Sequence, residues 1–101
     1  MNKIITENID KIKEYCKQYK VKELYAVGSV VTEKFTKDSD IDLVIKFEDI
    51  SVEEYTDNYF ILHKLFRNIF KRNIDLITDR SLSNPYFIKS IENSKKLLYA
   101  G

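Results

Sequence analysis

The chain has 101 residues, 44% of them hydrophobic and 33% charged, with a formal net charge of +1. That length allows one hydrophobic core, so we expect a single domain over residues 1–101 with its functional site on the surface of that core. The balanced charge gives no indication of direct nucleic-acid binding or of a membrane partner. Cys16 is the one cysteine, which excludes an internal disulfide, and no apolar run approaches the roughly 20 residues of a membrane span. We therefore expect a cytoplasmic protein.

The first third of the chain is predicted to form a helix and then a strand. A charged segment over about residues 7–19 has apolar side chains at helical spacing, which predicts an amphipathic helix: Ile9, Ile12, Cys16 and Tyr19. The segment ELYAVGS, from Glu23 to Ser29, is typical of a short apolar strand that ends at a glycine. A short turn or helix is expected next, in VVTEKF.

The segment DIDLVIKF predicts a second strand with carboxylates on one face. Its apolar and polar residues alternate with a period of two, and it is rich in β-branched residues. This alternation places Ile41, Leu43 and Ile45 on one face. Asp40 and Asp42 share the other face, where side chains two residues apart lie about 6.5 Å from each other. The two carboxylates repel unless a cation lies between them.

The second half of the chain predicts a long helix, a third strand and a last helix. Ser51 and Glu54 have the spacing of a capping box. The helix that they open is expected to end near residues 71–73 and to bury one stripe: Tyr55, Tyr59, Leu62, Phe66 and Ile69. The segment NIDLIT predicts a strand, and Asn84 followed by Pro85 predicts the start of the last helix. The expected fold class is α/β (α+β), a small mixed sheet of about three strands flanked by helices.

A third carboxylate, Asp75, stands in the same Ile-Asp-Leu context as Asp42. If the second and third strands are neighbours, Asp40, Asp42 and Asp75 converge at one edge of the sheet. Carboxylate oxygens suit Mg²⁺, and a pair of such ions holds the attacking and leaving oxygens of a phosphoryl-type transfer. The pattern therefore predicts a magnesium site with these three aspartates as ligands.

Two structural explanations compete with a metal site. Asp38 is explained well as a turn residue, but Asp42 lies inside an apolar run and Asp75 repeats its context. The segment DSDIDLVIKFED also has aspartate at positions 1, 3 and 5 of a twelve-residue EF-hand loop. Its sixth residue is Leu43, where that loop needs glycine, and its twelfth is Asp49, where glutamate binds. An EF-hand is therefore excluded.

Gly28 and Ser29 lie where the first strand is expected to end. Glycine permits close approach of the backbone, and exposed N–H groups and a serine hydroxyl are donors for a phosphate. A Gly-Ser pair alone is more typical of a turn than of a site. Here, after ten residues, it is followed by Asp40-x-Asp42. The combination resembles the G-S-x10-D-x-D signature of the DNA polymerase β-like nucleotidyltransferase superfamily.

Over essentially its whole length, the chain is similar to the minimal nucleotidyltransferases, short members that are often antitoxins beside a HEPN-domain ribonuclease toxin. The resemblance implies the polymerase β-like palm fold and transfer of AMP from ATP to a hydroxyl of a protein partner. It assigns the catalytic metals to Asp40 and Asp42 and the nucleotide phosphates to Gly28 and Ser29. It assigns activation of the acceptor hydroxyl to Asp75.

The phosphate loop departs from the family pattern. Many members have an arginine and a further glycine shortly after the serine, whereas this chain has VVTEK from Val30 to Lys34. Lys34 and Lys37 are candidates to bind the nucleotide phosphates instead, although lysines in a turn are more often only solvated. A second hypothesis is therefore a binding module that regulates a partner by contact. Transfer to a small molecule is disfavoured, because a chain of this length has no extra domain for a second substrate pocket.

Three other side chains have weaker functional signals. His63 lies on the long helix without a second histidine or a cysteine nearby in sequence, which is more typical of a helix-flank histidine than of a metal ligand. Tyr86 and Tyr99, towards the end of the sequence, are candidates for a partner surface.

Overall fold

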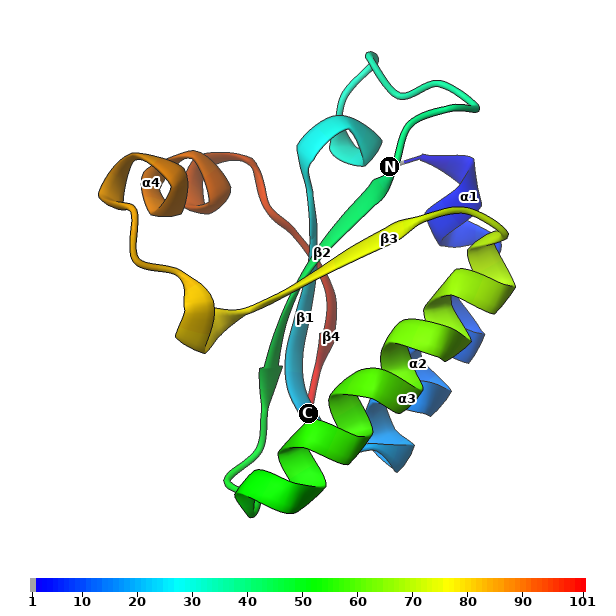
Figure 1. The fold of residues 1–101 in the computed structure, drawn as a ribbon. Helices are drawn as coiled ribbons and strands as arrows, with labels where there is room; N and C mark the ends of the chain where they lie inside the picture. The colour runs from blue at the N-terminus through cyan, green and yellow to red at the C-terminus, as the bar shows by residue number, and fades with distance from the viewer. Residues whose placement is uncertain (1) are drawn as a thin grey trace.

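The computed structural model describes residues 2–101, which form a four-stranded sheet with helices on both faces (Figure 1). In chain order the elements are α1 (Lys3–Thr6), α2 (Ile9–Gln18), β1 (Val21–Val27), the 3-10 helix η1 (Gly28–Val31), β2 (Ile41–Phe47), α3 (Val52–Phe70), β3 (Ile74–Thr78), the 3-10 helix η2 (Asp79–Ser81), α4 (Pro85–Ser94) and β4 (Lys96–Ala100). The expected α/β fold class is confirmed. Among these residues we find no helix with the length and apolar character to span a bilayer.

The strands lie in the order β3-β2-β1-β4. β1 pairs antiparallel with both β2 and β4, whereas β2 pairs parallel with β3. The sheet is therefore mixed, and β3 and β4 are its edges. Because β2 and β3 run in the same direction, their first residues meet at the same end of the sheet.

The sheet contains one strand more than the sequence pattern indicates. In β4 only Leu98 is buried, at 4% exposure, while the neighbouring Leu97 is 53% exposed. The segment therefore lacks the apolar run that marks a core strand in sequence. Its extended conformation depends on pairing with β1, for example Tyr99 opposite Leu24. Such a contact joins residues that lie far apart in the sequence, so local sequence does not encode it.

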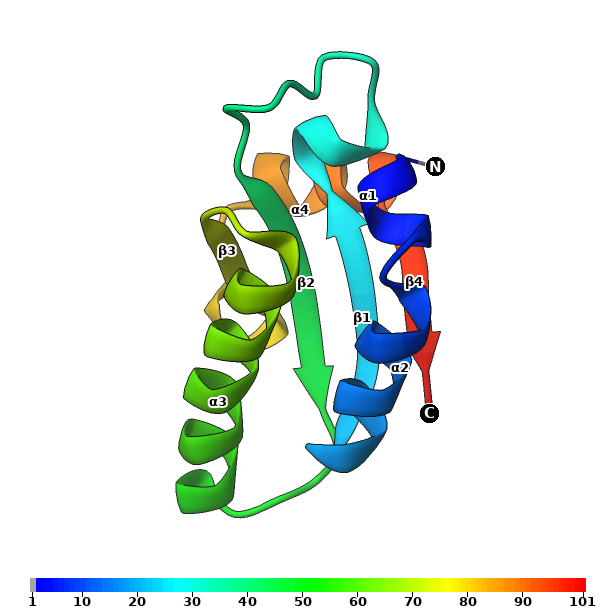
Figure 2. The same ribbon diagram turned by 90° about the vertical axis from the view of Figure 1, so that its right-hand side faces the viewer.

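The main hydrophobic core lies between one face of the sheet and the layer formed by α2 and α3 (Figure 2). The apolar face predicted for β2 is confirmed, since Ile41, Leu43 and Ile45 are fully buried there. Leu62 and Phe66 of α3 are also fully buried, and each such side chain contributes roughly 1.5–3 kcal/mol through removal from water. This core fixes β2 in the sheet and leaves its opposite face available for a site.

α4 covers the opposite face of the sheet (Figure 1). Between this helix and the sheet, Ile91 of α4 forms a small second apolar cluster with Val27 and Val44. Side chains two residues apart in a strand share a face, so Asp42 points to the same side as Val44. This face of the sheet is thinly packed, and the predicted aspartates belong to it.

The helix starts predicted from capping residues are confirmed. The Ser51 hydroxyl accepts a hydrogen bond from the Glu54 N–H at 3.1 Å, which caps α3. The Asn84 side-chain oxygen accepts from the N–H groups of Tyr86 and Phe87 at 2.9 and 3.3 Å, which caps α4. The second cap fixes where the aromatic residues of the first turn of α4 lie relative to the sheet.

Candidate active site

Asp42 and Asp75 lie side by side on neighbouring strands. In the parallel pairing of β2 with β3, Asp42 is opposite Asp75. Adjacent strands are about 4.8 Å apart, and paired residues point to the same face. Asp42 is partly buried, whereas Asp75 is exposed. The expectation that these two strands are neighbours is therefore confirmed, and it brings two of the three predicted carboxylates together.

Gly28 lies directly against the carboxylate of Asp42. β1 ends at Val27, which pairs with Asp42, and Gly28 follows it with a φ of +73°. A Cβ atom at Gly28 would lie 2.5 Å from Asp42 Oδ2. The left-handed backbone conformation disfavours any side chain independently of that clash. Glycine is therefore required for the backbone to pass this close to the carboxylate.

A cavity of about 160 Å³ opens beside the two aspartates, between the sheet and α4. Its lining consists of Val27, Gly28, Asp42, Asp75, Ile77, Phe87, Ser90, Ile91 and Ser94. Sites that enclose a drug-sized ligand have volumes of roughly 300–1,000 Å³. A ligand of that size bound here would therefore extend out of the cavity and over its rim. We call this space the aspartate cavity.

The pKa of Asp42 is raised above the ordinary aspartate value, first by partial burial and then by the negative charges of Asp75 and Asp40. Burial and like charge both disfavour the ionised carboxylate. None of the ion pairs formed within residues 2–101 involves these three aspartates. A bound cation would relieve the repulsion, so this arrangement favours cation binding over an empty site.

Asp40 is less closely associated with this pair. It precedes β2, is exposed and does not line the aspartate cavity, although its charge acts on Asp42. Within the described residues, no three acidic, histidine or cysteine side chains are gathered closely enough to hold a metal ion. Mg²⁺ is usually held by one or two carboxylates, with substrate phosphates and water as its other ligands. Asp42 and Asp75 fit that donor set, and a site that includes Asp40 stays a prediction.

The other predicted nucleotide-binding residues do not line the aspartate cavity. Ser29 follows Gly28 in η1, and its carbonyl accepts from the N–H and the hydroxyl of Thr32, each at 2.9 Å. Lys34 and Lys37 are exposed in the loop between η1 and β2. Neither lysine forms an ion pair with another residue of the range 2–101. Their side chains are therefore not committed elsewhere, and their roles towards a nucleotide stay predictions.

The wall that α4 contributes was not identified from sequence. Phe87, Ser90 and Ser94 lie on one face of that helix and all line the aspartate cavity. The Ser94 hydroxyl donates to the Ser90 carbonyl at 2.8 Å. In sequence these positions have only the spacing of an ordinary helix face. They become site residues because α4 returns across the sheet, which no local pattern indicates.

Arg72 is a further residue whose contacts near the site were not identified from sequence. Its Nη1 donates to the carbonyls of Thr36 and Ser39, at 3.1 and 2.8 Å. These contacts hold the loop that leads into Asp40, and they join residues that are 36 and 33 positions apart in the chain. Arg72 therefore fixes the entry to β2, and it is not itself a residue of the aspartate cavity.

His63 has a structural contact at the free edge of β3. Its Nε2 lies 3.0 Å from the carbonyl of Ile74, and because a carbonyl only accepts, Nε2 is the donor. Carbonyl directions alternate along a strand, and the carbonyl of Asn73 accepts from the Ile41 N–H of β2. The Ile74 carbonyl therefore points away from β2. This contact agrees with the interpretation that His63 is not a metal ligand.

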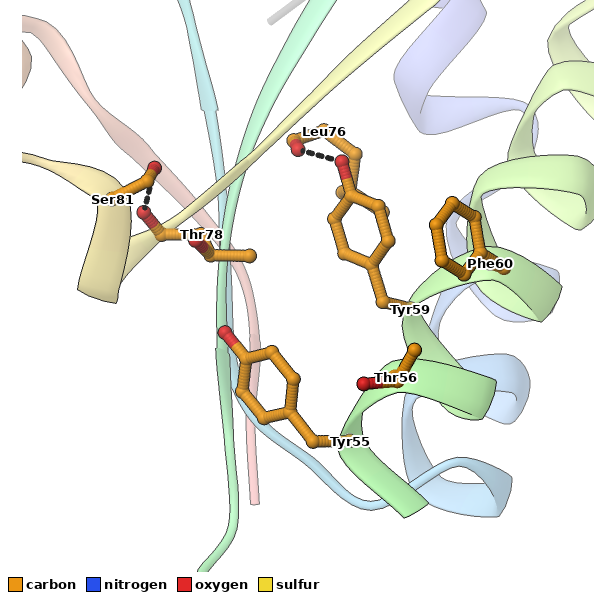
Figure 3. Close-up of a pocket in the computed structure, with 7 residues that line it drawn as sticks. All are labelled: Tyr55, Thr56, Tyr59, Phe60, Leu76, Thr78 and Ser81. Atoms are coloured by element: carbon orange, nitrogen blue, oxygen red, sulfur yellow. Dashed lines mark hydrogen bonds between the residues drawn. The ribbon is translucent and has the colours of Figure 1, made fainter. Parts of the chain in front are cut away.

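A larger cavity, of about 280 Å³, lies on the other face of β3 beneath α3 (Figure 3). Its lining consists of Tyr55, Thr56, Tyr59, Phe60, Leu76, Thr78 and Ser81. Figure 3 shows the Tyr59 hydroxyl donating to the Leu76 carbonyl, at 2.7 Å, and the Ser81 hydroxyl donating to the Thr78 carbonyl, at 2.9 Å. The lining contains no carboxylate, amine or imidazole. We call this space the tyrosine cavity.

The chain is similar to known proteins in sequence and in fold. The family model described as a nucleotidyltransferase domain matches residues 9–98. A Methanocaldococcus jannaschii protein named "Putative protein adenylyltransferase MJ1379" is 36% identical over 89 residues, which are 87% of this chain and 88% of that protein. Another from the same organism, "Putative protein adenylyltransferase MJ0126", is 37% identical over 81 residues, which are 79% of each chain.

Solved structures share the fold at lower identity. A chain in a crystal structure of a toxin-antitoxin with AMP-PNP has a TM-score of 0.72 at 21% identity, over 93% of this chain and 74% of that one. A complex of tri-AMPylated Shewanella oneidensis HEPN toxin with MNT antitoxin contains a chain with a TM-score of 0.66 at 19% identity, over 95% and 72%. A structure described as a "putative minimal nucleotidyltransferase" has a TM-score of 0.70 at 17% identity, over 95% of both chains. The chain thus belongs to the nucleotidyltransferase family, with the fold of its minimal members.

Proposed function

We propose that this protein transfers AMP from ATP to a hydroxyl group of a partner protein, and that the partner is a HEPN-domain toxin. The observation that carries the proposal is the pairing of Asp42 with Asp75 beside Gly28 in one cavity. Relatives supply the support for the acceptor. One is named a protein adenylyltransferase, and one structural neighbour is a complex of an AMPylated HEPN toxin with an MNT antitoxin.

Mg²⁺ is part of the proposal because the donor set suits it. Asp42 would hold the ion, with Asp75 beside it, and Asp40 is the further ligand that the family signature assigns. When bound, Mg²⁺ neutralises negative charge on the phosphate oxygens during the transfer. Oxygen-only ligands of like charge, without an amine or imidazole beside them, are the surroundings that hard cations prefer.

The two paired aspartates differ in exposure, and we assign them different tasks on that basis. Asp42 is partly buried against Gly28, so its carboxylate is fixed and suits cation binding. Asp75 is exposed, so a hydroxyl on another macromolecule is able to reach it. Asp75 takes the proton of that hydroxyl as its oxygen attacks the α-phosphorus of ATP. A new oxygen–phosphorus bond forms, the bond to the β-phosphate oxygen breaks, and pyrophosphate leaves with the electron pair.

The test is incubation of the purified protein with ATP, Mg²⁺ and a candidate HEPN-domain partner from the same organism, followed by intact-mass measurement of that partner. We expect addition of one or more AMP units, on a tyrosine hydroxyl, and no addition when Mg²⁺ is removed with a chelator. An unchanged mass, together with suppression of the ribonuclease in a stable complex, would contradict the enzymatic proposal. That result would instead support the binding-module hypothesis.

A further inference from the structure

The first turn of α4 has two neighbouring aromatic side chains, and they differ in their relation to the aspartate cavity. Tyr86 is 86% exposed and Phe87 is 46% exposed. Phe87 lines the cavity together with Asp42 and Asp75, whereas Tyr86 does not. A large apolar ring that borders a cavity and is almost half exposed is incompletely packed by its own chain. Phe87 is also the one aromatic residue of that lining.

The size of the aspartate cavity determines where the parts of a nucleotide are able to lie. At about 160 Å³, it is smaller than sites that enclose a whole drug-sized ligand. In the proposed reaction the phosphates lie at the carboxylate end, beside Asp42 and Gly28. The nucleoside must then extend from there and leave the cavity over its rim. The α4 side of the lining offers one large apolar surface to a nucleoside, Phe87, because Ser90 and Ser94 are small.

The backbone that carries Phe87 is held in place before any ligand arrives. Its backbone N–H donates to the side-chain oxygen of the capping residue Asn84, at 3.3 Å. In the next turn, Ile91 is 5% exposed and packs with Val27 and Val44 of the sheet. Because both the cap and the packing hold the helix, a ligand that stacks on the ring would lose little affinity to ordering of the protein.

We propose that Phe87 is the residue on which the base of the bound nucleoside triphosphate stacks. This inference rests on the proposed function, since it needs a nucleotide whose phosphates lie at Asp42. Base–aromatic stacking in proteins corresponds to about 5- to 150-fold in affinity per base. A phenyl ring contacts the face of a base and not the polar groups on its edge. Phe87 therefore supports binding of ATP and GTP alike and does not discriminate between them.

The test compares two magnesium complexes by calorimetric titration: ATP, which has a base, and inorganic tripolyphosphate, which has none. For Phe87→Ala we expect the ATP affinity to fall by about 5- to 150-fold and the tripolyphosphate affinity to stay within about twofold. Phe87→Tyr keeps an aromatic face and should bind ATP as the parent does. Tyr86→Ala is the matched control, because it removes the adjacent aromatic ring outside the cavity, and it should leave both affinities unchanged.

The possible outcomes separate this inference from the proposed function. If the parent binds both complexes and Phe87→Ala binds ATP equally well, base stacking on Phe87 is wrong while the nucleotide site stands. If Phe87→Ala weakens ATP and tripolyphosphate by the same factor, the residue has a structural role only, and the inference is again overturned. If the parent binds neither complex, the proposed function fails, and the inference that rests on it fails too.

Discussion

The two faces of β3 border two cavities, and the contrast between them is the basis on which we place the proposed chemistry in one of them. Asp75 and Ile77 face the aspartate cavity of about 160 Å³, whereas Leu76 and Thr78 face the tyrosine cavity of about 280 Å³. In the tyrosine cavity, the hydroxyls of Tyr59 and Ser81 already donate to the backbone. In the aspartate cavity, the carboxylates are crowded and lack a cationic side chain. We therefore base the proposed site on unneutralised charge in a cleft and not on the size of the cavity.

Side chains of α3, among them Tyr59 of the tyrosine cavity, cover the free edge of the sheet. β3 is an edge strand, and two of its outward carbonyls accept hydrogen bonds from α3: Leu76 from Tyr59 and Ile74 from His63. Covered edge groups are protected from pairing with another chain. The pKa of Tyr59 is raised, first by burial and then by the negative charge of Asp75, so its hydroxyl stays a donor to a higher pH than that of an ordinary tyrosine.

The substitution Asp75→Asn tests whether the aspartate cavity carries out the reaction, because it removes the carboxylate that we assign to proton transfer. Asp75→Asn should lower AMP transfer by about 10²–10⁴-fold, since a general base is lost. Asp42 keeps its charge, so binding of the ATP–Mg²⁺ complex should fall much less than the rate. Intact-mass time courses with the partner, paired with calorimetric ATP titrations, measure the two effects. A variant that transfers AMP at the parental rate would remove Asp75 from the mechanism.

Gly28→Ala tests how closely the backbone approaches Asp42. The added Cβ would meet Asp42 Oδ2 at 2.5 Å, at a φ of +73° that disfavours a side chain. We expect a loss of about 1–3 kcal/mol in the free energy of unfolding and a clear loss of ATP affinity, because the carboxylate must move. Denaturant titration and calorimetry measure these. Ser29→Ala adds no Cβ clash and is the control for stability. Unchanged stability in Gly28→Ala would show that Asp42 is able to turn away freely.

Tyr59→Phe tests the opposite cavity. Loss of its hydroxyl leaves the Leu76 carbonyl without this donor, so the free energy of unfolding should fall by about 1 kcal/mol. The matched control is Tyr55→Phe, because the Tyr55 hydroxyl is buried with no hydrogen-bond partner among the described residues. That variant should be neutral or slightly more stable. Neither change should alter ATP affinity, and a loss in either would assign a nucleotide role to the tyrosine cavity.

Features that depend on local sequence were predicted. Features that depend on contacts between segments distant in sequence were not. The alternation of Ile41, Leu43 and Ile45 with Asp42 fixed the two faces of β2, because the period of a strand leaves no other arrangement. The cap at Asn84 is likewise local. In contrast, the α4 wall with Phe87 depends on where a helix lies across the sheet.

The strand β4 and the Arg72 contacts show the same limit of local patterns. β4 is extended because β1 provides a free edge for it, and Arg72 meets carbonyls more than thirty residues away in the chain. The aspartates were recognised for a different reason. Aspartates of like charge within an apolar strand destabilise the fold unless a ligand compensates for their repulsion. Their presence in the sequence therefore indicates such a ligand.

The pH dependence of stability in the metal-free protein tests the repulsion around Asp42, and we expect a small effect. The folded-state pKa of Asp42 is raised by burial and by its acidic neighbours. The protonated carboxyl of Asp42 therefore contributes to the stability of the folded protein. This contribution is fully present below the pKa of aspartate in the unfolded chain, about 3.9, and is lost as the pH rises through the raised pKa of the folded state. Asp42→Asn cannot ionise, so its melting temperature should match that of the parent at about pH 3.5 and exceed it increasingly towards pH 7. Thermal unfolding of both proteins with a chelator measures this difference.

Addition of Mg²⁺ at pH 7 should then raise the melting temperature of the parent more than that of the variant, because the cation offsets a repulsion that only the parent has. If the two melting curves shift together at every pH, the crowded carboxylates carry no strain, and the contrast between the two cavities loses its electrostatic basis.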